Sequence, residues 1–161
     1  FSCLCIKDEN TSFKPIWKPP FITLLQPLDK CHLNGFCTRD GKPRYVTALG
    51  SSDNPLGWRD TKANGGILMD ITTNEILARG LSMPHSPRWH QEKLYLLESG
   101  TGAISYYDFE TKKEKYFQSA NGVSTFALTT QVLCHDEWTL DTFQLRHAQL
   151  VNCLATHWEL N

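Results

Sequence analysis

Short apolar or aromatic runs, separated by polar turn residues, recur along most of the chain. Examples are "RYVTALG" at 44–50, "ILMDITTNEILAR" at 67–79 and "AISYYDFETKKEKYF" at 103–117. Short apolar runs rich in β-branched and aromatic residues, bounded by turn residues, are typical of β-strands. Turn residues such as Asp40-Gly41 separate the runs at hairpin spacing. The pattern therefore predicts a mainly β protein built from antiparallel hairpins.

A four-residue signature, D-x-x-T, marks several of the turns between these runs. It occurs at 8–11, 70–73 and 108–111, each time between two strand-like segments. The Asp side chain is suited to accept hydrogen bonds from backbone N–H groups two or three residues later. The second and third copies recur at a spacing of roughly 40 residues, which is the size of a four-stranded propeller blade. A fourth copy at 136–139 has the letters without the flanking strands.

These signals predict a partial β-propeller of four-stranded antiparallel blades. The expected units within a 1–134 propeller domain are a half blade at 1–30, blades at 31–80 and 84–118, and a partial blade at 119–134. Residues 135–161 are expected to form a helical or irregular tail, because apolar residues there recur every three or four positions. A complete propeller has about four to eight blades, so we expect the chain to be a fragment of a longer parent.

Charge and hydropathy exclude some functions. The 161 residues carry a formal net charge of -1, and 40% of them are hydrophobic. A chain without a strongly basic field is not expected to bind nucleic acid or an anionic membrane surface. No apolar run approaches the length needed to span a bilayer. We therefore expect a cytoplasmic protein whose partners are small molecules or other proteins.

The cysteine pattern favours free thiols. The six cysteines form no C-x-x-C pair, which argues against a zinc knuckle or a thioredoxin-type motif. Buried free thiols in a reducing compartment are the first interpretation, and structural disulfides are the alternative. Cys3 and Cys5 alternate and are expected to face the same side of a strand.

Two histidines occupy matching places in the expected blades. His32 and His85 each stand at the start of the first strand of a full blade, which in a propeller lines the central channel. Neutral imidazoles are good ligands for divalent iron, zinc or copper. The two residues are thus candidate metal ligands. Binding a polar ligand in the channel, or satisfying backbone groups of the inner strands, are the other interpretations.

A long polar loop and a proline-flanked segment supply further candidates. The loop at 51–66 is longer than a simple connection requires, and prolines on both sides fix the backbone around Ser86. The proline-flanked segment at 84–90 carries hydroxyl, guanidinium and imidazole groups. This combination suits recognition of an anion or a carbonyl group. The candidate ligand-binding residues are His32, Asn34, Trp58, Arg59, Lys62, His85, Ser86 and Arg88.

The segments "RYVTALG" and "GLSMPHSPRWH", together with "GWRDTKANGGILMD" and "LYLLESGTG", carry a resemblance. Over about residues 1–117 the chain resembles an uncharacterised bacterial family of conserved hypothetical proteins with propeller-like repeats, a domain of unknown function. The resemblance implies a longer parent with blades on both sides, and it implies no reaction.

Three hypotheses for function follow. The first is an uncharacterised propeller-like protein that binds a small ligand or a protein partner. The second is an enzyme whose axial site, lined by His32 and His85 and holding a divalent metal in one version, is completed by blades outside this chain. The third is a truncated gene product without independent activity. The sequence contains no H-E-x-x-H, P-loop or G-x-S-x-G motif that would name a reaction.

Overall fold

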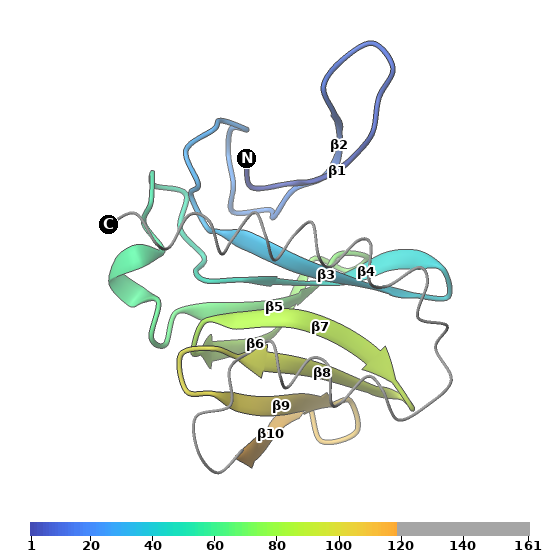
Figure 1. The fold of residues 1–161 in the computed structure, drawn as a ribbon, viewed down its shortest axis with the longest axis vertical. Coiled ribbons are helices and arrows are strands. Elements are labelled where there is room, and N and C mark those ends of the chain that lie inside the picture. The colour runs from blue at the N-terminus through green and yellow to red at the C-terminus, as the bar shows by residue number, and fades with distance from the viewer. Residues whose placement is uncertain (119–161) are drawn as a thin grey trace. The chain divides into compact units, whose positions relative to one another are not determined.

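The fold is known from a computed structural model that describes residues 1–118. Within this range the chain forms three antiparallel sheets (Figure 1). Their strands are β1 (Leu4–Ile6) and β2 (Lys14–Trp17) in the first, β3 (Leu33–Arg39), β4 (Lys42–Ala48), β5 (Gly66–Asp70) and β6 (Glu75–Leu81) in the second, and β7 (Pro84–His90), β8 (Lys93–Glu98), β9 (Ala103–Asp108) and β10 (Lys113–Gln118) in the third. A short 3-10 helix, η1 (Arg59–Thr61), lies in the loop between β4 and β5.

The two larger sheets have the same simple order. Each contains four strands, and every strand pairs with its sequence neighbour: β3-β4-β5-β6 in one sheet and β7-β8-β9-β10 in the other. The prediction of a mainly β fold with four-stranded antiparallel units is thereby confirmed for the described residues. The partial blade and the helical tail expected at 119–134 and 135–161 lie outside the described residues.

Tight turns connect the first two strands of each unit. Asp40 and Gly41 both have positive φ, 53° and 73°, as the favoured two-residue hairpin turn requires. Gln91 and Glu92 fill the corresponding turn between β7 and β8 with φ of 45° and 58°. The second turn therefore reaches the same backbone shape without a glycine.

The D-x-x-T turns join the third strand to the fourth in both larger sheets. Asp70 Oδ1 accepts from the backbone N–H of Thr72 at 2.8 Å, and Asp108 Oδ1 accepts from that of Thr111 at 3.1 Å. In the β1–β2 hairpin Asp8 Oδ2 accepts from the backbone N–H of Thr11 at 2.9 Å. The expected turn hydrogen bonds are present in all three copies.

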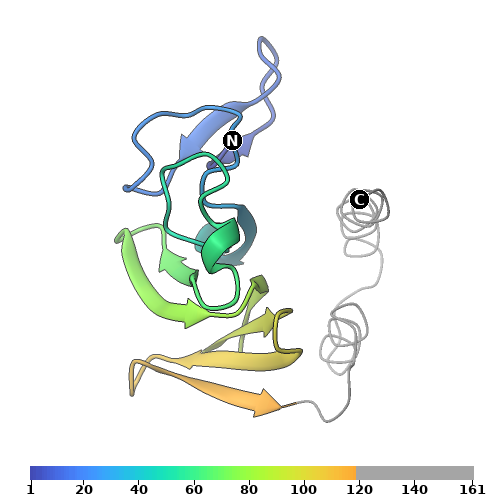
Figure 2. The same cartoon turned by 90° about the vertical axis from the view of Figure 1, so that its left-hand side faces the viewer.

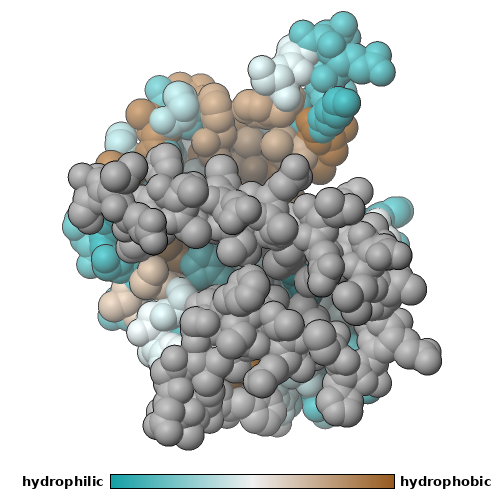
Figure 3. Space-filling view, viewed as in Figure 1, coloured by the Kyte–Doolittle hydropathy of each residue, from teal (hydrophilic) through white to brown (hydrophobic). Residues whose placement is uncertain are grey.

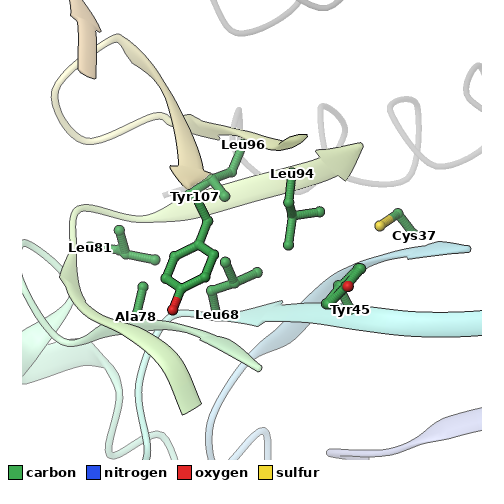
Figure 4. Close-up of a cluster of buried hydrophobic side chains, with 8 residues drawn as sticks. All are labelled: Cys37, Tyr45, Leu68, Ala78, Leu81, Leu94, Leu96 and Tyr107. Carbon is green, nitrogen blue, oxygen red and sulfur yellow. The ribbon is translucent and has the colours of Figure 1, made fainter. Parts of the chain in front are cut away.

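The two larger sheets pack face to face, and the N-terminal segment covers the far side of the first, so the unit has three layers (Figure 2). The core between the sheets is a cluster of aliphatic and aromatic side chains (Figure 4). Its members are Cys37, Tyr45, Leu68, Ala78, Leu81, Leu94, Leu96 and Tyr107. A second cluster joins the other face of the first sheet to the N-terminal segment: Ile22, Cys31, Val46, Ala48, Ile67 and Met69.

Free thiols are found at all four described cysteines, and the structure corrects the expectation that they are buried. Cys31 and Cys37 are buried, whereas Cys5 is exposed. The difference follows from position, because Cys5 lies in the β1–β2 hairpin, whose strand residues are mostly exposed, whereas Cys31 and Cys37 belong to the two apolar clusters. Among the described residues, no helix has the length and hydrophobicity needed to cross a bilayer.

Candidate functional site

The first strands of the two larger sheets lie against each other near their starts. Asn34 on β3 donates from Nδ2 to the carbonyl of Pro84 on β7 at 2.9 Å, and it accepts from Thr47 Oγ1 at 2.7 Å. A Cβ at Gly35 would stand 2.8 Å from Pro87 Cδ, so only glycine allows this approach. The close contact brings the beginnings of β3 and β7, and the histidines there, to one place.

His32, Asp29 and Trp58 form a hydrogen-bonded group just before β3. His32 Nδ1 lies 2.9 Å from Asp29 Oδ2, and Trp58 Nε1 donates to the same oxygen at 3.0 Å. The His32 and Trp58 rings are 4.5 Å apart between centroids. Since an ionised carboxylate only accepts hydrogen bonds, Nδ1 carries a proton, and in the neutral ring Nε2 is left as an acceptor.

His85 differs from His32 in its surroundings. Burial, reinforced by the nearby charge of His32, lowers the pKa of His85 to about 4. A histidine in such an environment is neutral at physiological pH. The site therefore combines a carboxylate-oriented imidazole with a partly buried, neutral one.

The backbone around the site is conformationally unusual. His32, Met83 and Ser86 all have φ of 50°, a left-handed conformation that costs a non-glycine residue about 1–2 kcal/mol. Residues held in this way need support from their neighbours and are frequent in binding and catalytic sites.

The long loop is fixed from both ends. Lys30 is buried, and its Nζ lies 2.9 Å from Asp53 Oδ1, while Thr23 Oγ1 donates to Asp53 Oδ2 at 2.6 Å. Further along, the carbonyl of Lys62 accepts from the backbone N–H of Met83 at 3.2 Å. The loop is therefore anchored to the connector before β3 and to the start of β7.

Five of the eight predicted site residues gather at this end of the two sheets. His32, Asn34, Trp58, His85 and Ser86 lie there, and Trp58 is buried rather than open to a ligand. Their roles in binding remain predictions.

The other three predicted residues lie around this group or apart from it. The Arg59 guanidinium stands 5.6 Å from the Trp58 ring centroid, and the side chain of Lys62 is exposed. Arg88 lies further along β7, where burial lowers its pKa and nearby Cys37 opposes that shift.

Sequence reasoning missed two buried or partly buried acids. Asp29, three residues before His32, orients the site, and the D-x-x-H spacing was the available signal. Glu98 on β8 is buried and accepts from the backbone N–H of Ser82 at 2.8 Å through Oε2. Its Oε1 has no hydrogen-bond partner among the described residues, and nothing in the sequence pattern distinguished this glutamate.

The described part of the chain does not bring together a complete set of metal ligands. Within residues 1–118 no group of three or more His, Cys, Asp and Glu side chains gathers in a way that could hold a metal ion. His32 and His85 as metal ligands would therefore need donors from elsewhere.

The fold and this site define the chain as a mainly β protein with two stacked four-stranded units and a histidine pair where the units meet. It belongs to the family described as Domain of unknown function (DUF4915), whose model matches residues 1–140. The match extends further than the resemblance at about residues 1–117 suggested. No curated protein and no solved structure matches the chain.

Proposed function

We propose that this protein binds a small polar ligand at the end of the sheets where β3 and β7 begin. The observation that carries the proposal is that His32, Trp58 and His85 come from three separate segments and lie together. The carboxylate of Asp29 orients the His32 ring among them. His32 Nε2 offers an acceptor and His85 offers a neutral imidazole. A ligand rich in hydroxyl or amide groups suits this combination.

The proposal is tested by recording imidazole NMR signals of the chain during titration with a panel of hydroxylated and carboxylated small molecules. We expect at least one compound to shift the His32 and His85 signals in a saturable way, and His85→Ala to abolish the response. His90→Ala, at the opposite end of β7, is the matched control. If no compound moves either ring, or if His90→Ala removes the response equally, the proposal is wrong.

The architecture supports a wider proposal, that the chain is part of a longer propeller in a reducing compartment such as the cytoplasm. Two successive four-stranded meanders packed face to face have the strand order of propeller blades. Four free thiols among the described residues favour a reducing environment. A structure of the full-length parent without further four-stranded units would overturn the propeller.

An enzymatic role is the second candidate, and the Asp29–His32 pair favours it. A carboxylate on Nδ1 and an acceptor at Nε2 is the arrangement of a histidine general base. Turnover of a panel of ester and glycoside substrates by the parent protein is the test. Activity that is lost in His32→Ala and kept in His90→Ala supports the enzyme.

A further inference from the structure

Two buried oxygen atoms of the β7–β10 sheet have no hydrogen-bond partner in the described part of the chain. They are Glu98 Oε1 and Ser105 Oγ, and the two residues are 3% and 0% exposed. Polar groups at the surface, such as those at the hydrophilic tip of the β1–β2 hairpin in Figure 3, can bond to bulk water. Glu98 and Ser105 lack that access, and a buried polar group left without a partner destabilises a fold.

Both side chains face the first of the two larger sheets. Leu96 pairs directly with Ser105 across β8 and β9, and directly paired residues share a face. Leu96 and Tyr107 belong to the core between the two larger sheets (Figure 4). Glu98 follows Leu96 by two positions on β8, and Ser105 precedes Tyr107 by two positions on β9. Strand alternation therefore places the two polar side chains on the same inner face.

The spacing of the two side chains suits one small bridging molecule. Glu98 pairs with Ala103, so Ser105 stands diagonally across from it, two positions further along β9. Diagonal neighbours on adjacent strands are about 7–8 Å apart, within reach of a long side chain. The two groups make no direct hydrogen bond. A single molecule between them would satisfy both oxygens.

The chemistry of the two oxygens favours water over a metal ion. An ionised carboxyl only accepts hydrogen bonds, whereas a protonated carboxyl and a hydroxyl can also donate. Water donates and accepts, so it serves Glu98 Oε1 in either protonation state. A calcium or magnesium ion takes about six or more ligands. Within residues 1–118, no group of three or more His, Cys, Asp and Glu side chains could hold a metal ion.

The other oxygen of the same carboxyl holds the crossover between the two larger sheets. Glu98 Oε2 accepts from the backbone N–H of Ser82 at 2.8 Å, and the N–H of Gly100 donates to the carbonyl of Ser82 at 3.2 Å. Ser82 lies between the end of β6 and the start of β7, just before His85. A molecule that fixes the Glu98 carboxyl therefore also fixes the backbone that leads into the histidine site.

We propose that Glu98 Oε1 and Ser105 Oγ bind a water molecule buried between the two larger sheets, and that this water fixes the Glu98 carboxyl on the crossover. Buried waters typically make about three hydrogen bonds to polar groups that lack other partners. The water belongs to the core of the fold, so this inference stands or falls independently of the proposed ligand.

A crystal structure of the 161-residue chain tests the site directly, and NMR cross-relaxation between water and protein tests it in solution. We expect density for a water within hydrogen-bond distance of both oxygens, and a water cross-peak to the methyl group of Ala103, which pairs with Glu98. In Ser105→Ala the water and its cross-peak should be lost. The Ser82 amide should then exchange about fivefold faster, as expected when one hydrogen bond is weakened.

Ser99→Ala is the matched control. It removes a hydroxyl that donates to the carbonyl of Met83 at 2.9 Å on the same crossover, but it leaves both water-binding oxygens in place. The water should be kept in this variant. Glu98→Gln should also keep it, because a side-chain amide can bond both to Ser82 and to a water.

Three results would overturn the proposal. One is a direct Glu98–Ser105 hydrogen bond, or a side chain from residues 119–161, in place of the water. The second is anomalous density from thallium(I) at the site that Glu98→Gln removes, which would identify a monovalent cation. The third is loss of the water in Ser99→Ala as well as in Ser105→Ala. If Ser105→Ala does not fold, the wild-type and Glu98→Gln structures still decide the question.

Discussion

Burial determines how His85 responds to pH. Its pKa in the folded chain is about 4, against 6.5 for an ordinary histidine. Below pH 6.5 the unfolded chain takes up a proton that the folded chain does not, so stability falls as the pH drops toward 4. The full effect of this residue is about 3 kcal/mol. Denaturant unfolding between pH 7 and 4 should show the loss, and His85→Gln should remove that part of it.

The proton on the His32 ring is a second prediction at the scale of one residue. Asp29 accepts from Nδ1 at 2.9 Å, so we expect the neutral ring to carry its proton on Nδ1, with Nε2 as the acceptor. Long-range ¹H–¹⁵N NMR distinguishes the two tautomers. In Asp29→Ala the preference should be lost, while His85 keeps its own pattern. A wild-type ring protonated mainly on Nε2 would contradict the geometry.

At the scale of the element, the contact between β3 and β7 depends on one small residue. A Cβ at Gly35 would lie 2.8 Å from Pro87 Cδ and 3.0 Å from Thr47 Oγ1. We therefore expect Gly35→Ala to destabilise the fold by about 1–3 kcal/mol through overpacking. Gly41→Ala is the comparison, because its surroundings are open but its φ is 73°. It should cost about 1 kcal/mol from backbone strain alone, as thermal denaturation can measure.

The turn carboxylates differ in burial, and their contributions to stability should differ accordingly. Burial opposes ionisation of Asp70, but hydrogen bonds from Thr72 and Arg44 keep its pKa below the usual value. Asp70→Ala should cost about 1–3 kcal/mol, because charged hydrogen bonds to a buried group are lost. Asp8 has the same turn role but is only partly buried, so its replacement should cost less. The stabilisation by Asp70 is present above the unfolded pKa and is lost as the pH falls through the folded one.

The strands could be predicted from the sequence because their signals are local. Short runs rich in apolar residues mark β4 and β5, which are buried on both faces over much of their length, and Asp40-Gly41 alone specifies a two-residue turn. The site could be predicted only in outline, because its geometry depends on distant partners. Asp29 meets Trp58 across the long loop, and no spacing rule encodes that contact. The exposure of Cys5 depends on how little of the β1–β2 hairpin is covered by the rest of the chain, which the local pattern cannot show.

At the scale of the whole described unit, two apolar clusters join the three layers. Leu96 lies in the cluster between the two larger sheets. Ile22 lies in the cluster that joins the N-terminal segment to the first of these sheets. Because the first sheet contributes to both clusters, we expect cooperative unfolding of the three layers. Leu96→Ala and Ile22→Ala should each cost about 2–5 kcal/mol and should shift one shared transition.

Hydrogen exchange separates this expectation from its alternative. If the layers unfold together, either substitution speeds exchange of the slowest amides in β4 and β8 alike, since both strands report the same global opening. If Ile22→Ala speeds exchange only before residue 32, the N-terminal segment opens by itself. Cooperative opening would mean that a ligand bound at the histidine site also slows exchange in the N-terminal segment, through the sheet that both clusters share.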